Sequence, residues 1–303
     1  MKLSPLLAIA STSSSTLIQV TFDPSGIPRI DVESGRSLGR PHVVHMGCHG
    51  YTATADYAVG TNSVAVSNTR VRNIGVLVPT INSEPIMGVR HRESMTTSKI
   101  GIGPGSDLLR RGGQIDFVRQ STAGGFLRLG GSEENFIAND CLPDSIMRML
   151  VVVPDDSTNY FNRRGETRIS VSIGENMVAT DSVSSMDSGN SLLIMPNRWI
   201  ADILAMLPPS GEEFGYRSVF TDCARTLQRL PIITLTFTAG GLRLLPEDYT
   251  RTTGQDDTCE LRIGGSLEWD ADQTIRFNPL LIPGINARST DNEIILCDSA
   301  IDL

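Results

Sequence analysis

The chain has 303 residues, of which 40% are hydrophobic and 20% are charged, and its formal net charge is −8. No apolar run approaches the roughly 18–20 residues of a membrane span, so the sequence predicts a soluble protein with no membrane partner. The acidic balance and the lack of a dense Lys/Arg block argue against a nucleic-acid partner. The length is sufficient for two lobes of about 150 residues each.

The first sixteen residues are expected to be a leader. Lys2, a short apolar segment and the A-x-A pattern of residues 8–10 are typical of a short signal peptide. A leader followed by a buried first strand explains the same letters, and both interpretations stay open.

From residue 17 onward, short apolar runs alternate with turn-forming residues, and helical stretches are few. This pattern is typical of an all-β architecture. Turn formers interrupt the strands near residues 151–166, which places a lobe boundary there. We therefore expect an N-terminal β lobe at 17–150 and a C-terminal β lobe at 151–303.

Each half carries one copy of the same short acidic pattern. Residues 33–38 read ESGRSL and are followed by Pro41, whereas residues 187–192 read DSGNSL and are followed by Pro196. The two copies are about half a chain length apart, and each follows a strand-like run. Repetition at this period predicts a duplicated fold with two similar lobes.

A carboxylate in each lobe has a specific chemical use. Two carboxylates that meet across an interface cannot both ionise readily, so one stays protonated. The charged group can take a proton from water while the neutral group donates to a carbonyl oxygen, with no metal or cofactor. The catalytic candidates are Glu33 and Asp187. The residues expected to shape the two turns and bind substrate are Ser34, Gly35, Ser188 and Gly189.

The order of these motifs resembles that of the pepsin-like aspartic proteases. The DYAVG run with Tyr57 and Gly60 resembles the flap hairpin that covers the substrate. Further runs resemble later parts of the family in order: KIGIGPGSDL (99–108), GGFLRLGGSEENF (124–136), NYF (159–161) and the stretch from Cys223 to Ile263. The resemblance spans about residues 17–263.

The resemblance implies a bilobed, mostly β fold, with two six-stranded-type lobes and a cleft that binds an extended peptide or protein substrate. It implies an aspartic endopeptidase that hydrolyses peptide bonds with a carboxylate-activated water, has no cofactor and is a monomer. It also implies a disulfide between Cys223 and Cys259, worth roughly 3–4 kcal/mol in the chain-entropy model, and a secreted or endomembrane-lumen location. Cys48 is expected to be free.

The sequence departs from the family at the candidate dyad. Glu33 replaces the first aspartate, and its extra methylene moves the carboxylate by about 1.5 Å, where a misplacement of about 1 Å costs on the order of 100-fold in rate. Asp31 lies off the turn and is a weaker candidate. Arg36 and Asn190 replace the hydroxyl residues that follow each glycine. The alternative is therefore a catalytically inactive homologue that binds peptide or protein in the cleft.

Two other kinds of site are weaker interpretations. The DSGNS run faintly resembles a serine-protease motif, but it lacks the flanking glycines and a histidine in the expected context. The close group of His42, His45, Cys48 and His49 has zinc-ligand types, although its spacing matches no familiar closed site, and we predict no metal. Trp199 is expected in the core, on a short helix.

Overall fold

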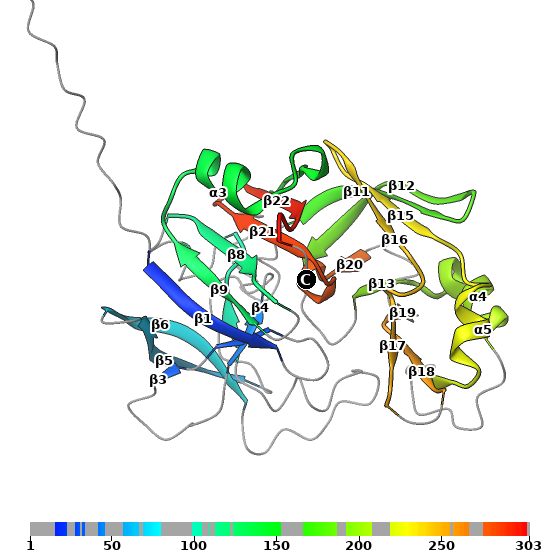
Figure 1. Cartoon of the computed structure of the whole chain (residues 1–303), viewed down its shortest axis with the longest axis horizontal. Helices are drawn as coiled ribbons and strands as arrows, with labels where there is room; N and C mark the ends of the chain where they lie inside the picture. Colours follow the sequence, from blue (N-terminus) through cyan, green and yellow to red (C-terminus); the bar gives the residue numbers. More distant parts are fainter. Residues whose placement is uncertain are drawn as a thin grey trace, which may run out of the picture.

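The computed structural model describes the backbone of residues 16–22, 28–30, 32–33, 42–45, 57–66, 69–79, 99–104, 109, 113–121, 124–152, 166–186, 192–207, 219–254, 257–266 and 275–301. Between residues 32 and 101 it describes the backbone alone. The protein is mostly β and bilobed, as the sequence predicts. In Figure 1, strands β1 to β9 lie on the left and strands β11 to β20 on the right, with β21 and β22 between them. No helix in the described segments is long and apolar enough to cross a membrane.

The largest sheet has the strand order β10-β22-β21-β8-β9-β1-β2-β4-β7-β6-β5-β3. The bounds of its strands are β1 (Thr16–Phe22), β2 (Pro28–Ile30), β3 (Val32–Glu33), β4 (His42–His45), β5 (Tyr57–Val66), β6 (Thr69–Pro79), β7 (Lys99–Gly101), β8 (Ile115–Arg119), β9 (Gly124–Leu129), β10 (Met147–Leu150), β21 (Ile285–Ser289) and β22 (Glu293–Asp298).

The second sheet has the order β16-β15-β11-β12-β20-β13-β19, and a small third sheet has the order β14-β18-β17. The bounds in the second are β11 (Glu166–Ile173), β12 (Asn176–Met186), β13 (Leu193–Pro196), β15 (Ile233–Thr236), β16 (Gly241–Leu244), β19 (Ile263–Ser266) and β20 (Ile275–Phe277). Those in the third are β14 (Val219–Phe220), β17 (Thr250–Thr252) and β18 (Cys259–Leu261).

The helical elements in the described residues are short: α3 (Glu133–Asp140), η1 (Pro143–Ser145), α4 (Asn197–Met206), α5 (Cys223–Leu227) and η3 (Pro279–Leu281). Helix α3 begins at Ser132, whose hydroxyl accepts a hydrogen bond from Asn135 N at 3.2 Å. This N-cap satisfies one of the free amides of the first turn. Helix α4 buries Trp199, as predicted, together with Ile200 and Ile203.

The alternation of apolar and polar residues along a strand explains which of its faces is buried. In β11 every second residue is buried, including Ile169, Val171 and Ile173, and β9 alternates in the same way. By contrast, every residue of β8 is buried, because its two faces pack into different clusters: Ile115 and Phe117 belong to the main core, and Val118 packs with Phe136 in a second cluster. The main hydrophobic core is one continuous cluster that draws residues from both halves of the chain.

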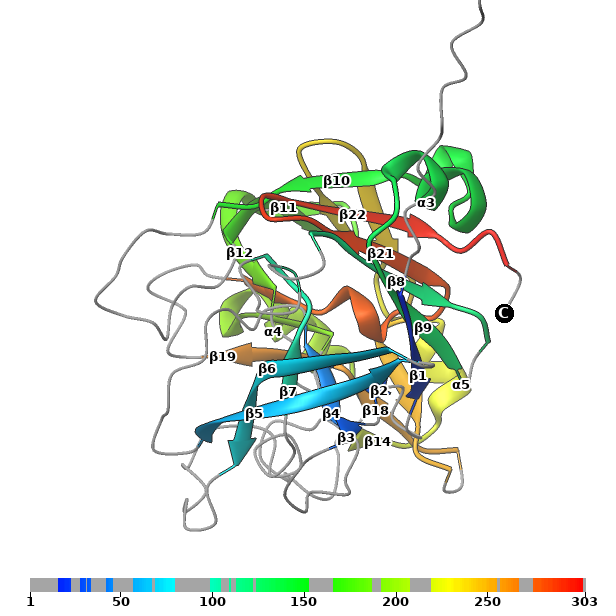
Figure 2. The ribbon, with the colours of Figure 1, turned by 90° about the vertical axis from the view of Figure 1, so that its left-hand side faces the viewer.

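The last two strands belong to the sheet of the first half. Strand β21 pairs antiparallel with β8, with Ala287 opposite Phe117, and β22 pairs with both β21 and β10. Figure 2 shows β10, β22, β21, β8 and β9 side by side. The chain thus crosses from one half to the other a second time after β20. The boundary at 150/151 stays a prediction, and sheet membership does not follow it.

Candidate active site

The structure describes part of the predicted site. Most of the two acidic motifs lies outside the described residues. The predicted residues that are not described are Asp31, Ser34, Gly35, Arg36, Cys48, Asp187, Ser188, Gly189 and Asn190. The backbone of Glu33 ends the short strand β3, where Glu33 lies opposite Ser63 of β5. These assignments of catalytic and substrate-binding roles stay predictions.

Tyr57 and Gly60 lie in the hairpin formed by β5 and β6. Tyr57 is opposite Pro79, and Gly60 is opposite Val76. The same ladder ends at the pair Val66 and Thr69, beside the turn that joins the strands. A hairpin is therefore present here, and Tyr57 lies at the end of the ladder far from the Val66–Thr69 pair, so a role of Tyr57 over the substrate stays a prediction.

The backbone around the second acidic turn is firmly anchored on both sides. Strand β12 ends at Met186, directly before the turn, and Leu192 follows the turn and leads into β13. Both strands pair with β20, which lies between them: β12 in parallel and β13 antiparallel. In addition, Leu192 N donates to Arg262 O at 2.7 Å, and Asn278 N donates to Leu192 O at 2.8 Å. Residues 187–191 thus connect two strands that are fixed to the same short strand.

The two faces of this three-strand unit differ. Met186, Leu193 and Phe277 are aligned on one face and are buried in the core. The opposite face carries Arg276 and Ile194, which lie opposite each other and are only half-buried. A charged side chain therefore lies on the face of β20 that is turned away from the core.

Two arginines are anchored on the carbonyl groups at the end of η3. Arg119 Nη2 donates to Leu280 O at 2.7 Å, and Arg262 Nη1 donates to Leu281 O at 3.1 Å. These are consecutive carbonyls at the end of η3, where the helix leaves acceptors without intrahelical donors. Burial lowers the pKa of Arg119, and the charge of Arg262 lowers it further, to about 10.

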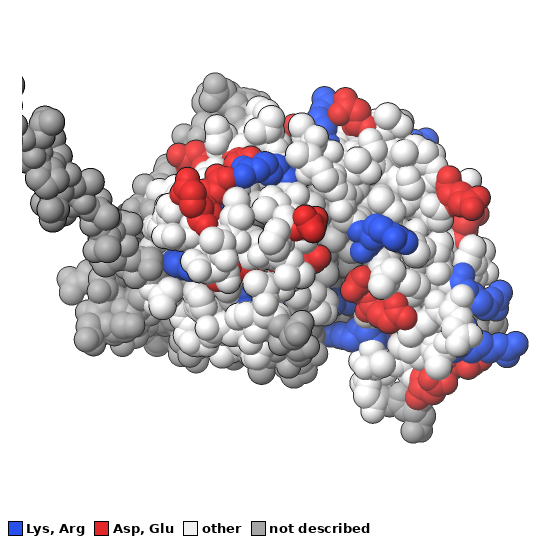
Figure 3. All heavy atoms as spheres, turned by 45° about the horizontal axis from the view of Figure 1, so that its top comes forward, with Lys and Arg blue, Asp and Glu red and all other residues white. Residues whose placement is uncertain are grey.

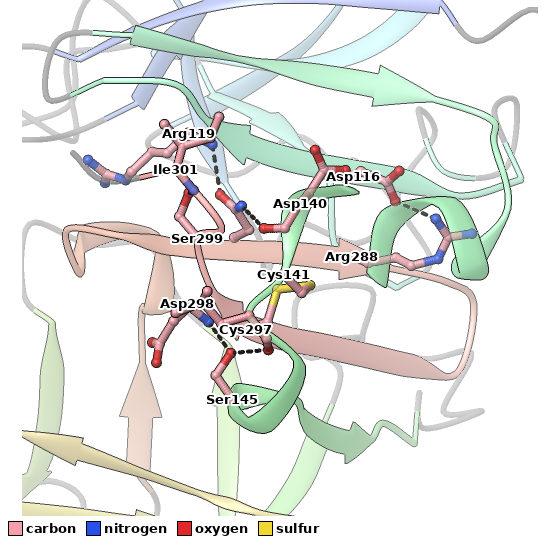
Figure 4. Close-up of a disulfide and its surroundings, with 12 residues drawn as sticks. Asp116, Arg119, Asp140, Cys141, Ser145, Arg288, Cys297, Asp298, Ser299 and Ile301 are labelled. Atoms are coloured by element: carbon pink, nitrogen blue, oxygen red, sulfur yellow. Dashed lines mark hydrogen bonds and ion pairs between the residues drawn. A yellow bond between two sulfur atoms is a disulfide. The ribbon is translucent and has the colours of Figure 1, made fainter. Parts of the chain in front are cut away.

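A second group of charged residues, buried between the strands of the first sheet and α3, has its charges paired. Arg288 donates to Asp116 Oδ1 at 2.6 Å, and Arg128 Nε donates to Asp116 Oδ2 at 2.9 Å. Arg128 also contacts Asp140, and Arg288 contacts Gln114. Because both carboxylates have cationic partners, this network connects β8, β9, β21 and α3 rather than binding a ligand. Figure 4 shows Arg288 directed at Asp116.

The structure contains two disulfides among the described cysteines. Cys223 and Cys259 join α5 to β18 with a Cα–Cα distance of 5.5 Å, which is the pair that the sequence predicts. Cys141 and Cys297 join the end of α3 to β22, with Cα atoms 5.4 Å apart. Figure 4 shows this second bond, which the sequence did not indicate because its cysteines are 156 residues apart and lie in different halves of the chain.

Within the described segments no group of His, Cys, Asp and Glu side chains could hold a metal ion. His42 and His45 lie in β4 and are described by backbone only, and Cys48 and His49 lie outside the described residues.

Comparison with known proteins identifies the fold. No protein-family model matches the chain, and no curated protein matches it. Among solved structures, the crystal structure of an aspartic proteinase from Irpex lacteus is similar, with a TM-score of 0.62 and 11% sequence identity. The match covers 95% of this chain and 98% of that chain. The chain therefore has the fold of pepsin-like aspartic proteinases over nearly its whole length.

Proposed function

We propose that the protein is an aspartic-type endopeptidase that binds extended peptides in a cleft between lobes at 17–150 and 151–303. One observation carries the proposal. The segment 187–191, which carries the DSG sequence, joins two strands that both pair with β20, in a chain of which 95% matches the fold of an aspartic proteinase. The second copy of the pattern begins at Glu33, at the end of β3.

In the proposed reaction Glu33 and Asp187 share one proton. The ionised carboxylate takes a proton from the attacking water, and the protonated carboxyl donates to the carbonyl oxygen of the scissile peptide bond. Tyr57 and Gly60 cover the peptide from the β5–β6 hairpin. No cofactor takes part, and the protein acts as a monomer. The two disulfides support an oxidising compartment, so we infer that the protein is secreted or lumenal.

A specific observation favours a second candidate function, a catalytically inactive homologue that binds peptide or protein in the same cleft. Glu33 is one methylene longer than the aspartate of the family pattern, and Arg36 adds a cation three residues further on. A cation near an acid favours its charged form and disfavours the shared proton.

A peptide-library digest between pH 3 and 6, with and without a pepstatin-type inhibitor, tests the proposal. The unmodified chain is compared with Glu33→Asp combined with Arg36→Ser. We expect inhibitor-sensitive cleavage by the unmodified chain, and a rate about 100-fold higher in the double variant, because the carboxylate returns to the geometry of the family.

The matched control is the double variant that also carries Asp187→Asn, which should be inert because one carboxylate cannot act as both acid and base. Equal rates in the unmodified chain and the double variant would make Glu33 a fully competent catalytic acid. Cleavage by the double variant alone would establish the inactive homologue. No cleavage by either, with retained peptide binding, would assign a binding role.

A further inference from the structure

Thr167 of β11 and Ser184 of β12 bury their hydroxyl groups in the second sheet. Thr167 is 3% exposed and Ser184 is 0% exposed, and within the described segments neither Thr167 Oγ1 nor Ser184 Oγ has a hydrogen-bond partner. Charges on the surface differ in this respect, because acidic and basic side chains are interspersed over the face of the molecule in Figure 3. A buried hydroxyl without a partner costs free energy, and folded proteins seldom leave one.

The two hydroxyl groups are neighbours. Thr167 and Ser184 lie directly opposite each other in the antiparallel ladder of β11 and β12. Side chains at such positions point to the same face of the sheet, with Cβ atoms about 4.5–5.5 Å apart. Here that face is the core face, because Ile169 and Met186, each two residues further along its strand, are 1% exposed. One small molecule between the strands can therefore reach both oxygen atoms.

The core face of β12 carries small side chains at this point. Ser182 and Ser184 are both buried there, whereas the residues opposite them on β11, Ile169 and Thr167, are larger. Two serines in succession on a buried face leave space that a larger apolar side chain would fill in a closely packed core. Ser182 also places a third hydroxyl group beside the first two. Buried water molecules in proteins make two to four hydrogen bonds, which these three groups can supply.

We propose that a buried water molecule binds between Thr167 and Ser184 and joins β11 to β12 on the core side of the sheet. Water fits because each hydroxyl group can donate and accept a hydrogen bond, and a water molecule can do the same toward both. A charged ligand does not fit, since the surrounding residues on this face, Ile169, Met186 and Ile275, are apolar and buried.

The proposed water site lies close to the candidate active site along the chain. Ser184 is two residues before Met186, the last residue of β12, and the DSG segment begins directly after it. A water molecule that bridges the strands here stabilises the end of β12 from which residues 187–191 depart. Water binding requires no catalytic activity, so the site and the proposed function stand or fall separately.

A high-resolution crystal structure of the unmodified chain tests the proposal directly. We expect a density peak about 2.5–3.0 Å from both Thr167 Oγ1 and Ser184 Oγ, the usual length of a hydrogen bond between two oxygen atoms. Direct contact between the two hydroxyl oxygens would overturn the proposal, and so would two separated oxygens without a peak between them.

Urea denaturation of three variants gives an independent test: Thr167→Val, which keeps the shape of the side chain, Ser184→Ala, and the two combined. Each single change should raise the unfolding equilibrium constant about 10-fold, because it leaves the water and the remaining hydroxyl with one partner fewer. The combined change should also raise it about 10-fold, well below the roughly 100-fold of two independent losses, because the water departs once both hydroxyls are gone.

The matched control is Thr236→Val, which removes a hydroxyl group from an exposed position on β15 in the same sheet. It should change the unfolding equilibrium constant by less than about 2-fold.

The direction of the single-variant effect separates the possibilities. If the hydroxyl groups have no partner of any kind, removing one relieves an unsatisfied group and lowers the unfolding equilibrium constant, which would overturn the proposal. Independent effects that multiply in the combined variant would also overturn it, because the two hydroxyls would then share no ligand. If a variant does not fold, the density between the two oxygen atoms of the unmodified chain decides alone.

Discussion

At Gly125, on β9, the backbone of the neighbouring strand β8 lies too close to leave room for a side chain. A Cβ atom at this position would fall on the carbonyl oxygen of Val118 and lie 3.1 Å from Cα of Arg119. Both atoms belong to the backbone of β8, which is held between β9 and β21 and cannot move aside. We predict that Gly125→Ala lowers the free energy of unfolding by about 1–3 kcal/mol, as overpacking does elsewhere, measured by urea denaturation.

Gly124 provides the matched control. A Cβ there would be 3.4 Å from the nearest atom, the carbonyl oxygen of Val20, which is an ordinary contact. Gly124→Ala should therefore change the free energy of unfolding by no more than about 0.5 kcal/mol. If the two substitutions destabilise equally, the loss comes from glycine's general role in the hairpin, and the close contact with β8 is not its cause.

At the residue scale, some contacts can be predicted from the sequence and others cannot. Cys223 and Cys259 were predictable because the resemblance to a family supplied the pair. Arg288 and Asp116 were not, because they are 172 positions apart and a charged residue in a strand normally indicates a solvent-exposed face. The burial of Arg119 depends on its contacts with Leu280 and Phe22, which are likewise distant in sequence.

Disulfide Cys141–Cys297 fixes one element, β22, to the end of α3. Its two cysteines are 156 residues apart, whereas Cys223 and Cys259 are 36 apart. In the chain-entropy model the longer loop is worth about 5 kcal/mol and the shorter one about 4 kcal/mol. We predict that replacing Cys141 and Cys297 by alanine lowers the free energy of unfolding by about 1 kcal/mol more than replacing Cys223 and Cys259.

Guanidinium denaturation of the two double variants measures this difference directly. Each single variant, Cys141→Ala and Cys297→Ala, should lose about as much stability as the corresponding double variant, because either change removes the bond. A greater loss for the Cys223 and Cys259 pair would mean that local packing around α5 and β18 outweighs the loop-closure entropy.

At the element scale, periodicity indicates a strand and its buried face but not its neighbours. The alternation in β11 was sufficient to recognise a half-buried strand. Strand β20 has only three residues, Ile275–Phe277, so it shows no period, and nothing in the sequence places it between β12 and β13. For the same reason the sequence assigned β21 and β22 to the second lobe along with the rest of the C-terminal half.

At the scale of the whole molecule, the first half is not self-sufficient. Strand β8 has β9 on one side and β21 on the other, so removing β21 exposes the ladder from Ile115 to Phe117. It also leaves Asp116 without Arg288, its partner at 2.6 Å. An uncovered strand edge and a buried acid stripped of one cation both destabilise a fold.

We therefore predict that residues 17–150, expressed alone, give no cooperative urea transition by far-UV circular dichroism and bind a hydrophobic dye. Fusing residues 285–301 to their C-terminus through a Gly/Ser linker of about ten residues should restore a cooperative transition. The fused segment supplies β21 and β22, the Arg288 guanidinium and Cys297 for the bond to Cys141.

The control is the same fusion with the order of residues 285–301 scrambled, which keeps composition and length but cannot pair in register. If the fragment 17–150 unfolds cooperatively without any addition, the two halves are independent folding units and the contribution of β21 is dispensable. If the scrambled fusion is as stable as the native one, bulk burial is sufficient, and neither the register of Ala287 with Phe117 nor the Asp116–Arg288 pair is what holds the first half together.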